Sequence, residues 1–177
     1  ASYSATYTVT EGDADQASPL QISGVTFTDA AGNVSAPADG TGVEKTIDAN
    51  SPTLSLVSIS SDNSNPAWAT VGDTVTLSFT SSEGIDTPTV LLDGMSATVV
   101  NTAGNDWTAS YTFAGGETEG IIPFSIVFVD TAGNAGISVL ATTDLSSVTY
   151  DEAPPLAPSI TAIASDDYIN NSEKGEV

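Results

Sequence analysis

Hydrophobic and polar residues alternate with a period of two along most of the chain, which is the pattern of β-strands that have one buried face. The clearest example is a single segment in which Val75, Leu77 and Phe79 share one side. Gly, Pro, Asn and Asp interrupt the alternation at intervals of about ten residues, and no segment combines helical spacing with helix caps. The pattern therefore predicts an all-β chain.

The best-defined strands are expected between residues 51 and 153. They cover residues 54–60, 73–80, 88–92, 96–101, 107–113, 123–129 and 146–151. About seven short strands in about a hundred residues are typical of an immunoglobulin-like β-sandwich with Greek-key connections. The chain has no Cys, so the Cys–Trp–Cys hallmark of antibody domains is missing and only the architecture is predicted.

The chain also repeats itself. Residues 3–9 match 107–113, residues 25–33 match 126–134, residues 45–48 match 148–151, and residues 54–62 match 158–166, at offsets of 101 to 104 positions. This register predicts tandem repeats: one complete repeat over 51–153, the C-terminal half of a preceding repeat over 1–50, and the first strand and loop of a following repeat over 154–177. A half-repeat has an open core and unpaired strand edges. Proteolysis, an incomplete fragment and strand exchange between molecules all stay open as its origin.

The charge is strongly one-sided. The 177 residues include 23 Asp and Glu against two Lys, with no Arg or His, which gives a net charge of −21. Such a chain repels nucleic acid and anionic membrane surfaces, and no apolar run is long enough to insert into a membrane. The carboxylates either spread out in water as a solubilising surface or collect a cation. Clustered Asp, Asn and Glu oxygens suit Ca²⁺, which takes six to eight oxygen ligands.

The residue types argue against an enzyme. Without His, Cys or a Gly-x-Ser-x-Gly motif, the chain lacks the usual nucleophile and base pairs. Paired carboxylates in loops leave a glycosidase open on residue type alone, but they recur in repeated loops and indicate no cleft.

The strongest local motif is Asp-x-Ala-Gly-Asn, which occurs at 29–33 and 130–134. One interpretation is an Asx-turn, with Gly at positive φ and Asn closing the turn. The other is a Ca²⁺ site at the end of the sandwich where the chain enters, built from the motif, the incoming linker and the loop 81–86. This hypothesis names as ligands Asp130, Asn134, Glu83, Asp48 and Asn50, with Asp29 and Asn33 at the matching positions of the preceding repeat.

The end of the sandwich where the chain leaves also carries clustered acidic residues. Asp62, Asp151 and Glu152 are candidate ligands there, with Glu117 and Glu119 in a neighbouring loop, although a solvated acidic surface has the same composition. The linkers 48–52 and 151–155 contain Pro and are short. A cation that bridges such a linker to the next domain would turn a flexible chain into a rod.

The segments 128–134, 79–85, 105–112 and 151–155 (FVDTAGN, FTSSEGI, NDWTASYT and DEAPP) resemble the immunoglobulin-like extender repeats of large bacterial adhesins of the RTX group, which leave the cell by type I secretion. The resemblance implies an extracellular, cell-surface region in which Ca²⁺ at domain junctions stiffens tandem repeats and projects a binding tip, as in biofilm adhesion. By position, the implied ligands are Asp130, Asn134, Glu83 and Asp48. The glycine-rich nonapeptide repeats of the group do not occur in this chain.

Two alternatives stay open. One is a ligand- or glycan-binding module that uses exposed aromatic side chains such as Trp68, unless Trp68 folds back over the core; its ligand-binding residues are unknown. The other is a fibre subunit that self-associates through its incomplete terminal repeats by strand complementation. Apart from these, the expected partners are neighbouring repeats of the same chain.

Overall fold

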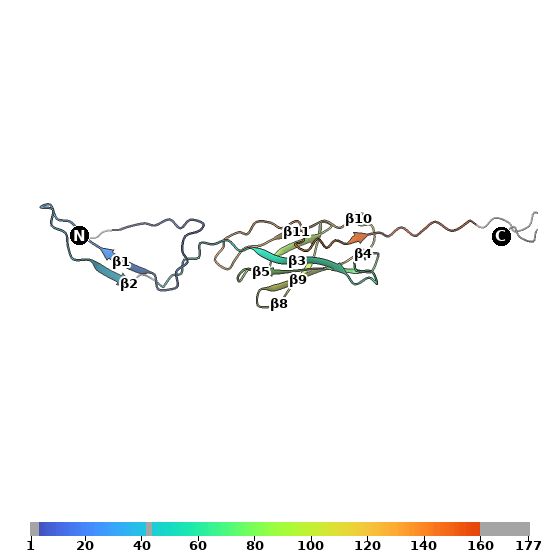
Figure 1. The fold of residues 1–177 in the computed structure, drawn as a ribbon, viewed down its shortest axis with the longest axis horizontal. Helices are drawn as coiled ribbons and strands as arrows, with labels where there is room; N and C mark the ends of the chain where they lie inside the picture. Colours follow the sequence, from blue (N-terminus) through green and yellow to red (C-terminus); the bar gives the residue numbers. More distant parts are fainter. Residues whose placement is uncertain (1–3, 42–43, 160–177) are drawn as a thin grey trace, which may run out of the picture.

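A computed structural model describes residues 4–41 and 44–159, and every regular element in this part of the chain is a β-strand (Figure 1). In chain order the strands are β1 (Gln21–Val25), β2 (Ala38–Thr41), β3 (Leu54–Ser61), β4 (Trp68–Ala69), β5 (Thr74–Ser81), β6 (Thr89–Leu92), β7 (Met95–Ser96), β8 (Thr98–Ala103), β9 (Asp106–Thr112), β10 (Gly120–Ile121), β11 (Phe124–Val127) and β12 (Thr149–Tyr150). The all-β prediction is confirmed. No helix in the described ranges has the length and hydropathy needed to cross a membrane.

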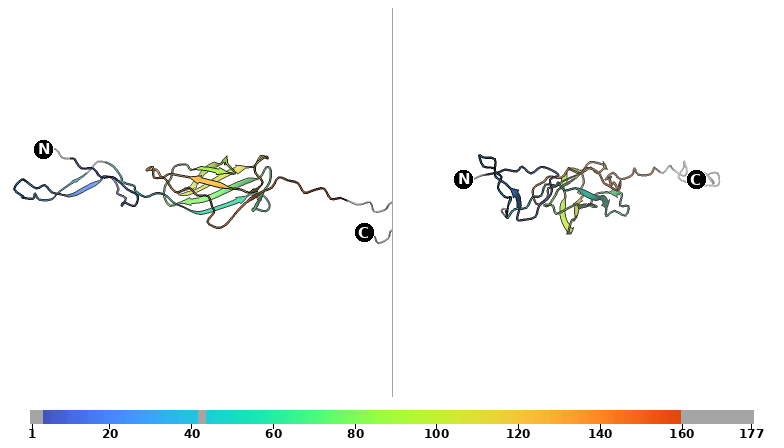
Figure 2. Two further views of the ribbon diagram at one scale, coloured as in Figure 1. Left: turned by 90° about the horizontal axis from the view of Figure 1, so that it is seen from above. Right: turned by 60° about the vertical axis from the view of Figure 1, so that its left-hand side comes forward.

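The strands from β3 onward form one layered unit, which we call the central unit (residues 51–153). Its largest sheet has the order β3-β5-β9-β8 and is antiparallel throughout. Two three-stranded sheets, β11-β6-β7 and β10-β12-β4, supply the other strands, and only the β12–β4 pair is parallel. Figures 1 and 2 show these strands running along the long axis of the unit, as in a β-sandwich.

The core lies between the sheets because the period-two pattern turns alternate side chains inward. In β5, Val75, Leu77 and Phe79 are at most 2% exposed, and they share one apolar cluster with Leu92 of β6 and Ile126 of β11. The aromatic rings of Phe113 and Tyr150 stack in the same core with centroids 4.6 Å apart. The apolar side chains of both sheets therefore close a single core.

The long expected strands agree well with β3, β5 and β9, whereas two other predictions need correction. The segment 96–101 is divided between β7, which pairs with β6, and β8, which forms a hairpin with β9. The segment 146–151 contains only β12, because the preceding residues form irregular hydrogen bonds such as that from Ser146 Oγ to Asp144 Oδ1. The two-residue strands β4 and β10 are too short to show an alternating pattern.

Residues 4–50 lie before the central unit, and we call them the N-terminal unit (Figure 1). Its described residues, 4–41 and 44–50, contain only the β1–β2 hairpin and isolated bridges. Several contacts of this unit recur in the central unit at the offsets found in the sequence. Tyr7 donates to Asp13 as Tyr111 donates to Glu117, 104 positions later. The pairing of Val25 with Ala38 recurs as that of Ile126 with Val139, 101 positions later.

The chain leaves the central unit as an extended segment, and residues 154–159 carry no strand. The strand expected near 158–166 lies almost wholly outside the described residues, as does the rest of the predicted third piece to residue 177. The division of the chain into repeats remains a prediction.

Candidate metal centre

Asp130 is a buried carboxylate at the end of the central unit that faces the linker, with 1% of its surface exposed. The chain turns back at residues 130–134, where Gly133 takes a φ of 102°. Asp130 Oδ1 accepts hydrogen bonds from the backbone N–H groups of Ala132, Gly133 and Asn134 at 2.7–2.8 Å. The Asx-turn interpretation is therefore correct for this motif, and Oδ2 accepts the Asn134 side-chain amide at 2.7 Å.

Two further carboxylates meet Asp130 there. Asp48 comes from the linker and Glu83 from the loop between β5 and β6, and ligand oxygens of all three residues lie within 4.8 Å of one another. Backbone hydrogen bonds set this geometry. Asp86 N–H donates to the Val129 carbonyl at 3.0 Å, which holds the Glu83 loop beside the Asp130 turn. Among the residues that the structure describes, this is the one group with metal-binding spacing.

Neighbouring charge and burial alter the ionisation of the group. Burial raises the pKa of the Glu83 carboxyl above its usual value, and the negative charges of Asp48, Asp130 and Asp15 raise it further. Burial alone would also raise the pKa of Asp130. The hydrogen bonds from the Asn134 side chain and the turn amides outweigh this, so the pKa of Asp130 falls below its usual value. The hydrogen bonds thus stabilise Asp130 as an anion, whereas burial and the neighbouring charges oppose ionisation of Glu83.

The two predicted amide ligands lie beside the carboxylates. Asn134 Nδ2 donates to Asp130 Oδ2 at 2.7 Å and to the Asp48 carbonyl oxygen at 3.2 Å. Asn50 Nδ2 donates to Asp15 Oδ1 at 2.9 Å. Both side-chain amides therefore donate to acceptors at the junction. These hydrogen bonds hold the Asp48 linker between the two units.

Two acidic residues at this junction were not among the predicted ligands, and both belong to the N-terminal unit. Glu11 accepts hydrogen bonds from the Ser51 N–H at 3.0 Å and the Ser51 hydroxyl at 2.7 Å, which lower the pKa of its carboxyl. Asp15 accepts the Ala49 N–H at 3.0 Å. The repeat register could have identified Asp15 as a residue of this junction. Glu119 lies 104 positions later and accepts the Glu152 N–H in the same way.

Asp29 and Asn33 have the same turn geometry without the cluster. Asp29 Oδ1 accepts the N–H groups of Ala31 and Asn33, and Oδ2 accepts Asn33 Nδ2 at 2.9 Å. Both residues are exposed, and Asp29 belongs to no group of three or more His, Cys, Asp or Glu side chains at metal-binding spacing among the described residues. The motif by itself therefore forms a turn. The neighbouring carboxylates of Asp130 are what distinguish its copy of the motif from that of Asp29.

The predicted ligands at the other end of the central unit do not come together as a group. Asp62 Oδ1 accepts the Thr74 N–H at 2.7 Å, and Asp151 Oδ1 accepts the Ala153 N–H at 3.0 Å. Glu152 Oε2 accepts the Gly116 N–H and the Tyr150 hydroxyl at 2.9 and 2.8 Å. These carboxylates accept hydrogen bonds from their own loop or from a neighbouring segment, and no three of them lie at metal-binding spacing among the described residues.

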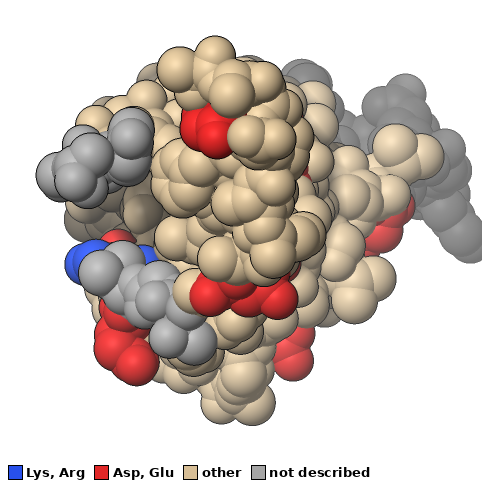
Figure 3. Space-filling model, turned by 90° about the vertical axis from the view of Figure 1, so that its left-hand side faces the viewer, with Lys and Arg blue, Asp and Glu red and all other residues tan. Residues whose placement is uncertain are grey.

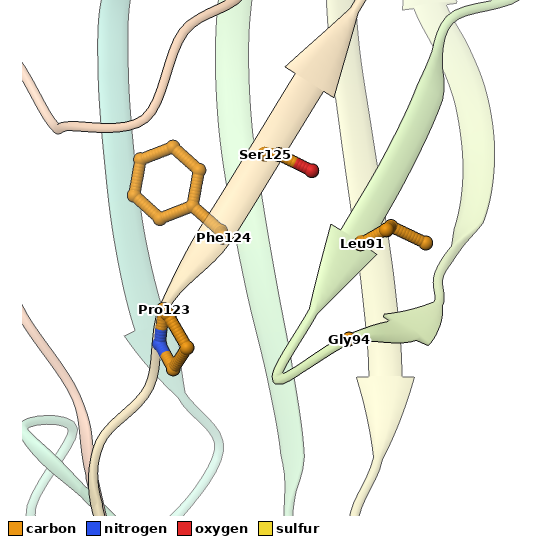
Figure 4. A pocket seen from close by; sticks show the side chains of 5 residues that line it. All are labelled: Leu91, Gly94, Pro123, Phe124 and Ser125. Atoms are coloured by element: carbon orange, nitrogen blue, oxygen red, sulfur yellow. The ribbon is translucent and has the colours of Figure 1, made fainter.

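The surface offers little positive charge to oppose these groups. Figure 3, viewed from the N-terminal side, shows red carboxylate patches among uncharged residues and very little blue. A hollow of about 200 Å³ over β6 and β11 has no titratable side chain in its lining (Figure 4). Its lining residues are Leu91, Gly94, Pro123, Phe124 and Ser125. The acidic junction is thus the place in the described structure where ligand-type oxygens converge.

Comparison of the chain with protein-family models, with curated proteins and with solved structures finds no match. The geometry of this junction is therefore the basis on which a function is inferred.

Proposed function

We propose that this chain is an extracellular extender region of a bacterial surface adhesin, in which Ca²⁺ bound at the Asp48–Glu83–Asp130 cluster stiffens tandem immunoglobulin-like repeats. The observation that carries the proposal is the meeting of these three carboxylates, one from a linker and two from loops of the next unit, within 4.8 Å. Three carboxylates at this spacing repel one another unless a proton or a cation lies among them.

The donor set favours calcium over other common ions. All candidate ligands are carboxylate, amide or backbone oxygens, and the chain has no Cys or His to favour zinc or another softer metal. Ca²⁺ accepts irregular arrangements of six to eight oxygens, whereas Mg²⁺ requires a near-ideal octahedron. Asp48, Glu83 and Asp130 would supply the charged ligands, and the Asp48 main chain and water would complete the shell.

The position of the cluster supports a mechanical role. Asp48 lies in the linker only four positions before Pro52, and the linker is already bound on both sides through Asp15 and Asn134. An ion held jointly by the linker and the central unit would oppose bending at this point. Repeated at each junction, such ions would make a rod that holds a binding tip away from the cell.

The strand order also supports the immunoglobulin-like part of the proposal. A four-stranded antiparallel sheet faces strands of the opposite layer, and β6 pairs with the distant β11. Such pairing is expected where two sheets are joined by Greek-key connections, and it supports this part of the proposal. The contacts that recur at offsets of 101 and 104 support the tandem arrangement. The resemblance to RTX extender repeats supplies the cell-surface setting and type I export.

The experiment is thermal unfolding of the full chain in EDTA, in Ca²⁺ and in Mg²⁺, with small-angle scattering under the same conditions. A ligand at about 100 times its Kd stabilises the native state by about 2.7 kcal/mol, which for a domain of this size is a Tm increase on the order of 10 °C. Ca²⁺ should produce this increase and narrow the range of interunit angles. An unchanged Tm together with an unchanged maximum dimension would refute the proposal.

A ligand-binding module is the second candidate, because Trp68 is 45% exposed rather than folded over the core. An exposed indole suits stacking on a sugar ring. Glycan-array binding by the full chain that disappears in Trp68→Ala would favour this function over a spacer.

A further inference from the structure

The N-terminal unit exposes apolar side chains whose counterparts in the central unit are buried. Val9 is 44% exposed and Val25 is 38% exposed. Their counterparts by repeat register, Phe113 and Ile126, are both 0% exposed. The two units therefore carry the same kind of inward-facing positions, but only the central unit covers them.

The central unit shows what the cover consists of. Ile126 of β11 pairs with Val90 of β6. Tyr111 of β9, the counterpart of Tyr7, pairs with Val75 of β5. Both covering strands come from the first half of the central unit, and the described residues of the N-terminal unit contain no equivalent strands.

The backbone edges of the N-terminal unit are open at the matching places. β1 pairs with β2 in a two-stranded sheet and has no second neighbour among the described strands. Residues 4–8, the counterpart of β9, belong to no strand pair in the described ranges. An open strand edge beside an apolar face binds an added strand through main-chain hydrogen bonds and side-chain pockets.

We infer that the N-terminal unit is a docking surface for a polypeptide segment equivalent to residues 51–104, which adds a β6-like strand to the edge of β1 and a β5-like strand to residues 4–8. The apolar side chains of this segment cover Val9 and Val25, because buried residues of β5 and β6 belong to the same apolar cluster as their counterparts Phe113 and Ile126. The two open edges are residues 4–8 and β1, and their counterparts β9 and β11 belong to different sheets of the central unit. The occupant must therefore supply a strand to each layer, so it is a two-layer β segment of this repeat type and not a single strand. The inference does not depend on calcium.

The test is a fusion that places a second copy of residues 51–104 ahead of Ala1, since Ala1 corresponds to Asn105 in the repeat register. Hydrogen exchange of the amides in residues 5–9 and 21–25 should slow by at least roughly tenfold relative to the parent chain. The unfolding transition of the central unit, recorded in the same sample, reports whether the fusion is folded. The separate polypeptide 51–104, added to the full parent chain, should slow the same amides.

Two variants of the fusion locate the surface. Val25→Asp should abolish the protection, whereas Leu145→Asp, at a side chain that is 91% exposed in the central unit, should retain it. The inference fails if the amides exchange as fast in the fusion and in the mixture as in the parent chain. It also fails if the parent chain alone dimerises and protects these amides, because a second copy is then the occupant. The exchange rates are measured in both EDTA and Ca²⁺, so that failure of the docking inference is distinguished from failure of the calcium proposal.

Discussion

The side-chain amide of Asn134 lies 3.2 Å from the main-chain oxygen of Asp48, a residue 86 positions earlier in the chain. The same amide donates to Asp130 Oδ2 at 2.7 Å. Asn134 thus connects the linker to the buried turn through hydrogen bonds of the protein itself. For the proposed calcium site this means that the linker is already held when an ion binds, so less ordering has to accompany binding, and a preorganised site binds more tightly.

The first prediction concerns Glu83, whose substitution should have opposite effects with and without calcium. In Glu83→Gln one of three neighbouring negative charges is lost, so the free energy of unfolding in EDTA should rise by up to about 1 kcal/mol. The same change removes a charged ligand, so the Tm increase caused by Ca²⁺ should shrink. Thermal unfolding of both proteins in EDTA and in Ca²⁺ measures both effects.

The pH dependence of this difference follows from the raised pKa of Glu83. A carboxyl whose pKa is higher in the folded state than its usual 4.5 contributes most stability below that value and loses the contribution as pH rises through the folded pKa. In EDTA, Glu83→Gln and the parent chain should therefore be similarly stable below pH 4.5, and the variant should gain its advantage above it. A difference that is the same at all pH values would contradict the electrostatic explanation.

The second prediction compares two aspartates with the same turn and different surroundings. Asp130→Asn keeps an oxygen for the turn amides but removes a charge from the cluster, so the Kd for Ca²⁺ should rise on the order of tenfold or more. Asp29→Asn makes the same change in a turn that lacks the other carboxylates, and calcium affinity should not change. Isothermal titration of the two variants checks this, and equal losses would show that the Asp130 cluster is not the site.

The turn and the cluster were predictable from the sequence to different degrees. The motif at 130–134 predicts its own turn, because Asp, Gly and Asn interact with backbone only two to four residues away. Glu83 and Asp48 were also predictable, since the expected sandwich places the loop 81–86 and the linker at one end. Glu11 and Asp15 were missed because their partners Ser51 and Ala49 depend on how the N-terminal unit approaches the linker.

At the other end of the central unit, the acidic composition of the loops did not predict how their carboxylates are arranged. Asp62 and Asp151 lie in acidic loops, as expected, but each carboxylate accepts a backbone N–H of its own loop or of a neighbouring strand. Acidic residues thus occur at both ends, but in the part of the chain that the structure describes only the packing of three segments around Asp130 brings three carboxylates together. Short strands such as β12 were misjudged for a related reason, because their pairing depends on β4 and β10 rather than on alternation.

The third prediction concerns the space beside Phe128 in the core. A Cβ added at Gly136 would overlap the ring of Phe128, which is 3% exposed, so the ring or the backbone at Gly136 has to shift. Gly136→Ala should therefore destabilise the central unit by about 1–3 kcal/mol, as overpacking usually does. Gly84→Ala is the matched control, because a Cβ there meets nothing within 4 Å and the residue has no positive φ. Denaturant unfolding of both variants tests the packing, and equal stability would show that the segment 135–137 can shift.

The fourth prediction concerns acid stability at the end of the central unit that carries Glu117. This carboxylate accepts hydrogen bonds from the N–H groups of Ala114 and Gly115 and from the Tyr111 hydroxyl, at 2.8–2.9 Å. These bonds lower the pKa of Glu117 from 4.5 to about 2. A lowered pKa contributes stability that is fully present above pH 4.5 and is lost as pH falls through about 2.

Glu117→Gln should therefore lower the Tm at pH 7 and flatten its decline between pH 4.5 and about 2, because the group that takes up the proton is no longer present. Glu119→Gln is the control, since the Glu119 carboxylate accepts a single longer hydrogen bond of 3.3 Å from Glu152. Thermal unfolding across this pH range distinguishes the two variants. If Glu117→Gln follows the parent curve below pH 4.5, another carboxylate must dominate the acid transition. The repeat register names Asp13 as the first to test, because it accepts the Tyr7 hydroxyl and the Thr10 N–H in the same way.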